Sequence, residues 1–128
     1  MARGYGMTLR EKVFSALNVP AVTDQLAKDA NGRSIYHIHS PDAGSYPILI
    51  YSAISDVPAL TADGVEQERR ATVRVHICTK DAVFEGTYQA VNAAMLDAGF
   101  MRYQTNEIFT AGIFILVCDY TIGIGVDE

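Results

Sequence analysis

The hydrophobic pattern of the sequence changes its period between residues 71 and 99. From Ala71 to Cys78, apolar and polar residues alternate. The apolar members are Ala71, Val73, Val75 and Ile77, and the polar members are Thr72, Arg74 and His76. This period of two predicts a strand that buries one face. From Ala82 onward the apolar residues follow helical spacing, so we expect a helix from Val83 to Ala98 with Gly99 as its C-cap.

The residues after this helix predict two further strands. Phe100 to Tyr103 and Ile108 to Ile122 are rich in the β-branched and aromatic residues that favour strands. Residues 105–107 separate the two segments, and Ala111-Gly112 permits a bulge or bend in the second. We expect residues 123–128 to form a fraying acidic tail.

The first part of the chain predicts one clear helix. Thr8 and Glu11 have the spacing of a capping box, and apolar residues recur every four positions behind them, so we expect a helix from Leu9 to Asn18. Val22 to Asp29 is expected to form a second short helical piece, which closes at the turn signal Asn31-Gly32. Ile35 to Ile38 reads as an edge strand.

The middle of the chain predicts a long hairpin. Ile48 to Ile54 forms one strand after Pro47, and Val65 to Thr79 forms the other. Ser55 to Arg70 is the longest weakly structured stretch, although its second half continues the alternation backwards from Ala71. The tip of the hairpin is therefore expected to protrude, either as a contact surface or as a passive loop.

Together these elements predict an α+β fold: a mostly antiparallel sheet with a long protruding β-hairpin, packed against one long helix and an N-terminal helix. At 128 residues the chain is expected to be a single domain, residues 1–128. Met1 to Gly6 has no apolar core of signal-peptide length, and the longest apolar run, Ile113 to Cys118, is too short to cross a membrane. We therefore expect a soluble intracellular protein.

Charge and motifs argue against several functions. The net charge of -5 disfavours a nucleic-acid-binding surface, because phosphate contacts need clustered basic residues. The chain has no nucleophile elbow or complete phosphate-binding glycine motif, and its carboxylates lack a paired spacing. We therefore expect no enzymatic activity, no catalytic residue and no cofactor.

Histidines and cysteines give only weak signals. His37, His39 and His76 offer the beginning of a metal site, but two neighbouring ligands are too few, and solvent-facing or hydrogen-bonded histidines are expected instead. Cys78 and Cys118 lie inside strands and are expected to be buried, reduced thiols; a bridge between neighbouring strands stays possible.

Asp119 and the apolar run around it point to assembly. Because a buried unpaired charge is costly, we expect Asp119 to lie on a solvent or interface face, or to pair with Arg74 or Arg102. The strand from Ile113 to Val117 places large apolar side chains on both faces, so either both faces are covered within the monomer or one meets a partner. The second reading favours an oligomer.

The order of these elements resembles the small tail-completion proteins of long-tailed bacteriophages and prophages, a family of tail terminators and head-to-tail joining proteins. The resemblance is carried by the helix Leu9 to Leu17, the strand Tyr46-Pro47-Ile48-Leu49-Ile50 and the charged hairpin. It continues through Ala71-Thr72-Val73-Arg74-Val75-His76-Ile77, the helix Val83 to Ala98 and a C-terminal β pair ending near Tyr120. It covers nearly the whole chain as a pattern of elements and apolar positions.

The resemblance implies a structural virion protein that caps the tail tube and joins it to the head connector. It implies a homo-oligomeric ring, commonly of six subunits, that contacts the tail tube protein and a head completion protein while DNA passes through without base recognition. It places the protein in the virion, and in the host cytoplasm during assembly. Head-to-tail closure needs two different patches on each subunit. We assign one to Glu66, Glu68, Arg69 and Arg70, and the other to the surface near Asp119.

Two other functions stay open at this stage. One is a cytoplasmic protein-binding module that acts as a dimer and presents its hairpin to another protein. The other is a small hydrolase or metal-dependent enzyme that uses His37, His39 and His76.

Overall fold

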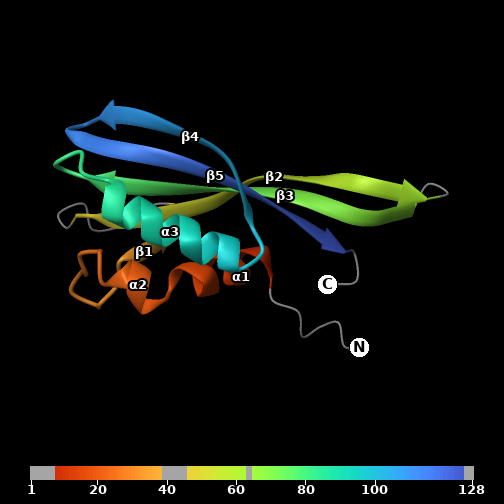
Figure 1. Cartoon of the computed structure of the whole chain (residues 1–128), viewed down its shortest axis with the longest axis horizontal. Coiled ribbons are helices and arrows are strands. Elements are labelled where there is room, and N and C mark those ends of the chain that lie inside the picture. Colours follow the sequence, from red (N-terminus) through yellow and green to blue (C-terminus); the bar gives the residue numbers. More distant parts are fainter. Residues whose placement is uncertain (1–7, 39–45, 63–64, 126–128) are drawn as a thin grey trace.

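The protein is an elongated α+β molecule in which three helices lie on one side of a five-stranded sheet (Figure 1). The computed structural model describes residues 8–38, 46–62 and 65–125, apart from the side chains of residues 57–68 and 124–125. The elements are α1 (Leu9–Leu17), α2 (Pro20–Thr23), β1 (Ile35–His37), β2 (Ile48–Ala62), β3 (Val65–Thr79), α3 (Glu85–Asp97), β4 (Met101–Thr110) and β5 (Ile113–Gly125). The fold class and the order of elements predicted from the sequence are confirmed.

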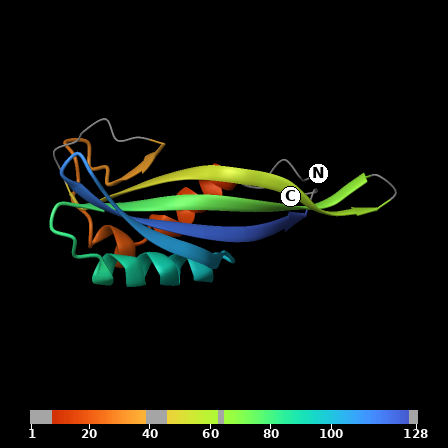
Figure 2. The same ribbon diagram turned by 90° about the horizontal axis from the view of Figure 1, so that it is seen from above.

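The sheet has the strand order β1-β2-β3-β5-β4. β1 pairs with β2 in parallel, and all other neighbours are antiparallel. Seen from above, β2 and β3 extend together well beyond the helices as a hairpin (Figure 2). The prediction of a long protruding hairpin is therefore confirmed.

One face of the sheet, which we call the helix face, carries the main core. The predicted apolar positions of β3 all point into it, and none is more than 1% exposed. Leu49 and Tyr51 of β2 and the alternate residues Leu116 to Ile122 of β5 join them, and the helices contribute Val13, Leu17, Val91 and Met95. Alternation on β3 thus identified the buried face correctly.

The helices begin and end where local polar contacts dictate. Thr8 and Glu11 form the predicted capping box at the start of α1. The second helix, however, is Pro20–Thr23 rather than Val22 to Asp29. Proline fits the first helical position, where no amide donor is needed. The carboxylate of Asp29 accepts hydrogen bonds from the amides of Asn31 and Arg33, and this holds a turn in place of a helix.

Helix α3 starts two residues later than predicted. The backbone before it is fixed by side chains, because Thr79 Oγ1 accepts from the amide of Ala82 and Asp81 Oδ1 accepts from the amide of Val83. Ala82 also has a φ of 61°, which is incompatible with a right-handed helix. The C-cap is Ala98 rather than the predicted Gly99, and Gly99 follows it with a φ of 97°, the left-handed conformation that commonly ends a helix at this position.

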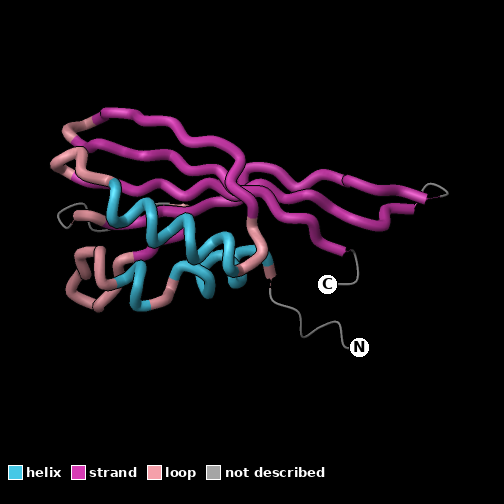
Figure 3. The backbone as a smooth tube through the Cα atoms, viewed as in Figure 1, coloured by secondary structure: helices cyan, strands magenta, loops and turns pink. Residues whose placement is uncertain are grey.

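The prediction of a weakly structured stretch was wrong for Ser55 to Ala62, which belong to β2, whereas the predicted extension of the other strand back to Val65 is confirmed. β2 and β3 pair continuously as far as Ala62 opposite Val65, with bulges on the way. Pro58 is tolerated inside β2 because β1 pairs only with residues 49–51, so β2 is an edge strand beyond that point. The tube view shows the paired strands reaching the far end of the molecule (Figure 3).

The closing hairpin turns later than predicted. Residues 105–107 lie within β4, and the turn is Ala111-Gly112, with φ of 52° and 78°. Two positive φ angles between the paired residues Thr110 and Ile113 define the two-residue turn that matches strand twist. β5 then continues through Gly125, opposite Glu68, so residues 123–125 are not a frayed tail. Residues 126–128 of that predicted tail lie outside the described residues.

Candidate subunit interface

The face of the sheet opposite the helices, here called the open face, carries an apolar patch. No helix of the described chain covers this face (Figures 1 and 2). The patch consists of Tyr36, Ile48 and Cys78, with Tyr46, Ile50, Ile113 and Ile115 packed around them. Strand β5 therefore has apolar side chains on both faces, as expected. On the open face, Val117 is buried and Ile113 and Ile115 are half-buried among their sheet neighbours.

A buried ion pair lies further along the open face. The guanidinium of Arg74 on β3 binds Asp119 on β5 with two hydrogen bonds, from Nε to Oδ1 at 2.8 Å and from Nη2 to Oδ2 at 3.0 Å. The two residues are direct cross-strand neighbours. Gln104 on β4 donates a third bond to Asp119 Oδ2, also at 3.0 Å. Three adjacent strands are thus joined through one carboxylate.

The surroundings of Asp119 keep it ionised. Burial alone would raise its pKa, but the hydrogen bonds from Arg74 and Gln104 outweigh burial and hold the pKa below the usual value. The hydrogen bond to Asp119 in turn raises the pKa of Arg74. His76, the next open-face position of β3, has its pKa lowered by burial and by the nearby Arg74 charge, so it is neutral near pH 7.

Asp119 is consequently not itself a surface group. Its side chain is 1% exposed, whereas that of Arg74 is 36% exposed. Of the two partners predicted for Asp119, Arg74 is confirmed; Arg102 instead donates to the hydroxyl of Tyr88 on α3, at 2.6 Å. An interface near Asp119 stays a prediction. In the free chain a partner at this place would contact Arg74 rather than Asp119 itself, because only Arg74 is partly exposed.

The other predicted patch lies on the protruding hairpin. Arg69 is half-buried and forms an ion pair with Asp56 across the hairpin, with Nη1 and Oδ2 3.4 Å apart, and Arg70 is exposed beside Gly123 of β5. Glu66 and Glu68 belong to β3, but their side chains lie outside the described part. The hairpin patch and Asp119 are separate places on the sheet. Asp119 lies opposite Arg74 of β3, and Arg70 precedes Arg74 by four residues, or roughly 13 Å along the strand.

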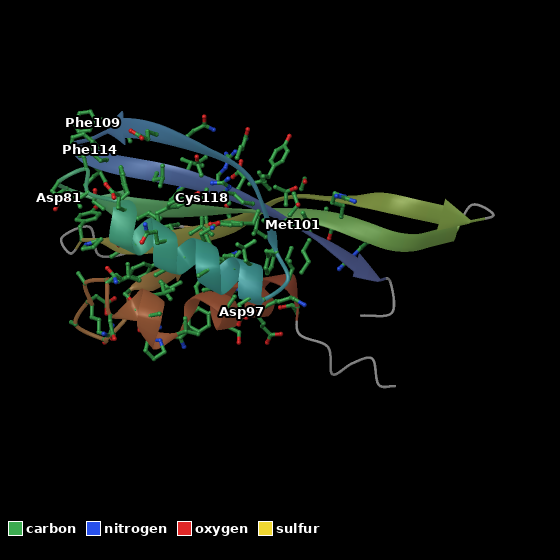
Figure 4. The ribbon with its side chains drawn as sticks, viewed as in Figure 1. Asp81, Asp97, Met101, Phe109, Phe114 and Cys118 are labelled. Carbon is green, nitrogen blue, oxygen red and sulfur yellow. The ribbon has the colours of Figure 1, made fainter. Side chains whose placement is uncertain are left out.

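Strand β4 is an exposed edge that the sequence did not single out. All ten of its residues are exposed, and it is the last strand of the sheet. Figure 4 shows Met101 and Phe109 toward opposite ends of this strand, with Phe109 beside Phe114 of β5. The signal in the sequence was the polar run from Arg102 to Glu107, which fits a strand with little buried surface.

His37 and His76 do not meet. His37 packs its ring against Tyr51 at a centroid distance of 5.1 Å on the helix-face side, while His76 lies on the open face and His39 lies outside the described residues. Within residues 8–38, 46–62 and 65–125, no group of three His, Cys, Asp or Glu side chains is arranged to hold a metal ion. None of the helices described there combines the length and the apolar character needed to span a bilayer.

A shallow groove lies beside α1. It has a volume of about 630 Å³ and is lined by Arg10, Glu11, Phe14, Arg33, Ile35, Tyr36, His37 and Tyr51. Burial and the Arg10 charge lower the pKa of His37, so the imidazole is neutral near pH 7. The groove offers aromatic surface with two guanidinium groups, but no nucleophile paired with a base.

The cysteines are buried and lie on opposite faces of the sheet. Cys78 contributes to the open-face patch and Cys118 to the main core, so they do not form a bridge. Burial raises the pKa of Cys78 to about 11 and that of Cys118 to about 12. Both thiols are therefore protonated at physiological pH, as expected of small buried hydrophobic residues.

Comparison with known proteins identifies a shared fold. No family model matches the chain, and no curated protein does. Among solved structures, the chain is similar to one from the virion of a native gene transfer agent (GTA) particle. The TM-score is 0.61 with 16% sequence identity, over 91% of this chain and 94% of that chain. At this identity the similarity establishes the fold, which the two chains share over almost their whole lengths.

Proposed function

We propose that the protein is a structural component of a phage-like virion, which caps the tail tube and joins it to the head connector. The observation that carries the proposal is the fold shared with a chain of a gene transfer agent virion over nearly the full length of both. The independent resemblance of the element order to tail-completion proteins supports the finer assignment. In this role the chain needs no catalytic residue and no cofactor.

The subunits form a closed ring, with six as the expected number. Ring closure from identical chains requires two different surfaces on each subunit. The protruding hairpin offers one, because β2 and β3 extend beyond the helices as a paired ribbon, and Arg69 and Arg70 belong to β3. The open face near Arg74 and Asp119 offers the other, because none of the described helices covers it and Arg74 is 36% exposed there.

The partners follow from the position in the particle. One side of the ring contacts the tail tube protein and the other a head completion protein, while DNA passes through the opening without base recognition. The net charge of -5 suits a lumen that does not retain DNA, because like charges repel. The protein then belongs to the virion and is assembled in the host cytoplasm.

Charge reversal in the hairpin tests the ring proposal. The variant Arg69→Glu with Arg70→Glu is expected to assemble less, while its unfolding free energy changes by about 1 kcal/mol, because solvent screens the partly exposed Arg69–Asp56 pair. Arg10→Glu with Lys28→Glu is the matched control, since it makes the same charge change at exposed residues away from the hairpin. Light scattering gives the assembled mass of both variants. An unchanged mass in the hairpin variant would remove the hairpin from the proposal.

A further inference from the structure

We propose that the outer edge of β4 pairs with β4 of a second copy of this chain, antiparallel and about a two-fold axis at Thr105. The contact joins two sheets into one and leaves the helices of both copies on the same side. It goes beyond the proposed function and does not depend on it, because it uses β4 and not the hairpin.

The edge is available along its whole length. β4 is the terminal strand of the sheet, and no described strand pairs with its outer side. Its ten residues are exposed, among them Met101 at 68% and Ile108 at 49%. Free edges present unpaired backbone amides and carbonyls, which can pair with a strand of another chain.

The pairing of β4 with β5 shows which side chains share a face. Met101, Gln104, Asn106 and Ile108 lie on the open face, because they stand opposite Thr121, Asp119, Val117 and Ile115. Arg102, Thr105 and Glu107 lie on the helix face, opposite Tyr120, Cys118 and Leu116. Tyr103 is the extra residue of a bulge between Arg102 and Gln104.

A two-fold axis at Thr105 makes this strand complementary to itself. Thr105 faces its own copy, and Gln104 faces Asn106. With Tyr103 left out as the bulge residue, Arg102 then faces Glu107 and Met101 faces Ile108, each pair on one face. Symmetry repeats every pair, so the contact contains two Arg–Glu pairs and two apolar pairs. Opposite charges facing across strands stabilise pairing, and like charges oppose it.

Charge also fixes the register. A shift of the axis to Glu107 would place the two Glu107 carboxylates opposite each other, which is unfavourable. The hydrogen bond from Arg102 Nη1 to the Tyr88 hydroxyl, at 2.6 Å, anchors the guanidinium at this edge and leaves further N–H groups for Glu107. The charged residues on the helix face of β4 therefore favour the register with its axis at Thr105.

Charge exchange between copies tests the pairing. Arg102→Glu and Glu107→Arg are each expected to raise the dimer dissociation constant roughly tenfold or more, because both symmetric pairs become repulsive. An equimolar mixture of the two variants is expected to recover wild-type dimerisation, since every facing pair is again opposite in charge. Sedimentation equilibrium measures each case. Wild-type protein that stays monomeric, or single variants that dimerise like wild type, would overturn the proposal.

Cysteine cross-linking tests the register itself. In a Cys118→Ala background, which removes the thiol facing position 105 on β5, Thr105→Cys is expected to form a disulfide-linked dimer under mild oxidation. Thr110→Cys in the same background is the control, because its two copies would lie roughly 33 Å apart along the paired strands. Failure of the first variant to cross-link, or equal cross-linking of the second, would contradict the register.

The same experiment separates this proposal from the ring. Cross-linking at position 105 is expected to persist when Arg69→Glu and Arg70→Glu are added, since the hairpin is not part of the β4 contact. Cross-linked dimers without any ring would contradict the proposed function and support the β4 contact. Rings that form without cross-linking at position 105 would support the proposed function and contradict the β4 contact.

Discussion

Arg74 donates two hydrogen bonds, of 2.8 Å and 3.0 Å, to the carboxylate of Asp119. The pair lies on a sheet face that no helix of the described chain covers. The pair is asymmetric, because the Asp119 side chain is 1% exposed and that of Arg74 is 36% exposed. Water can solvate part of the arginine but not the aspartate. The energetic consequences of removing the two partners should therefore differ.

Removal of the arginine is expected to be the more damaging change. Arg74→Met leaves a buried carboxylate with Gln104 as its remaining side-chain donor, and should lower the unfolding free energy by about 3–5 kcal/mol. Asp119→Asn keeps a hydrogen-bond acceptor and leaves a partly solvated arginine, so a loss of about 1–3 kcal/mol is expected. Urea unfolding measures both. A larger loss in Asp119→Asn than in Arg74→Met would contradict the burial argument.

His76 should make the fold weaken as pH falls. Its pKa is lowered in the folded chain by burial and by Arg74, so below the ordinary value of 6.5 the unfolded chain binds the proton more readily. The stabilisation is thus present above pH 6.5 and is lost as pH falls toward the folded pKa. His76→Gln is expected to show a smaller drop in Tm between pH 7.5 and 5. Equal pH profiles for the two proteins would rule out this role.

A substitution in the turn of the β4–β5 hairpin should raise the stability of the fold. Ala111 has a φ of 52°, in the left-handed region that costs an L-residue roughly 1–2 kcal/mol, and Gly112 follows with 78°. Asn-Gly is the preferred pair for this turn, so Ala111→Asn is expected to raise the unfolding free energy by about 0.5–1 kcal/mol. Thermal unfolding measures the gain. Gly112→Ala is the opposite control and should destabilise; a stabilising Gly112→Ala would mean that the turn geometry is different.

Both cysteines should be unreactive in the folded protein. Cys78 and Cys118 are buried, and burial raises their pKa values to about 11 and about 12, so little thiolate exists at pH 8. A thiol-specific reagent is expected to label neither in native protein and both in urea. Rapid native labelling of Cys78 would show that the open-face patch is more accessible than its packing indicates.

The sequence predicted those parts of the fold that local periodicity determines. Alternation along β3, the capping box of Thr8 and the end of α3 before Gly99 were all identified correctly, because each depends on neighbouring residues. The length of β2 was not predictable, because Pro58 indicates a loop until its pairing partner on β3 is known. The hairpin turn was predicted at residues 105–107 instead of Ala111-Gly112. Alanine seldom adopts a positive φ, so Ala111 did not indicate a turn.

The candidate site was predictable in part. Asp119 stood out as a charge in an apolar strand, and Arg74 was one of two possible partners. Gln104 was missed, because a neutral amide in a polar segment gives no signal before the strand register places it beside the carboxylate. The self-complementary edge of β4 was missed too, since it depends on knowing that the strand is terminal and where its bulge lies.

Particle mass and shape test the proposed virion role most directly. Light scattering across a concentration series, followed by negative-stain imaging of the largest species, should give rings of about six subunits with an open centre, single or joined in pairs. Loss of these rings in the Arg69→Glu, Arg70→Glu variant, but not in the Arg10→Glu, Lys28→Glu control, would support closure through the hairpin. If the wild-type protein never exceeds two copies at any concentration, the ring that underlies the proposed tail-capping role is contradicted.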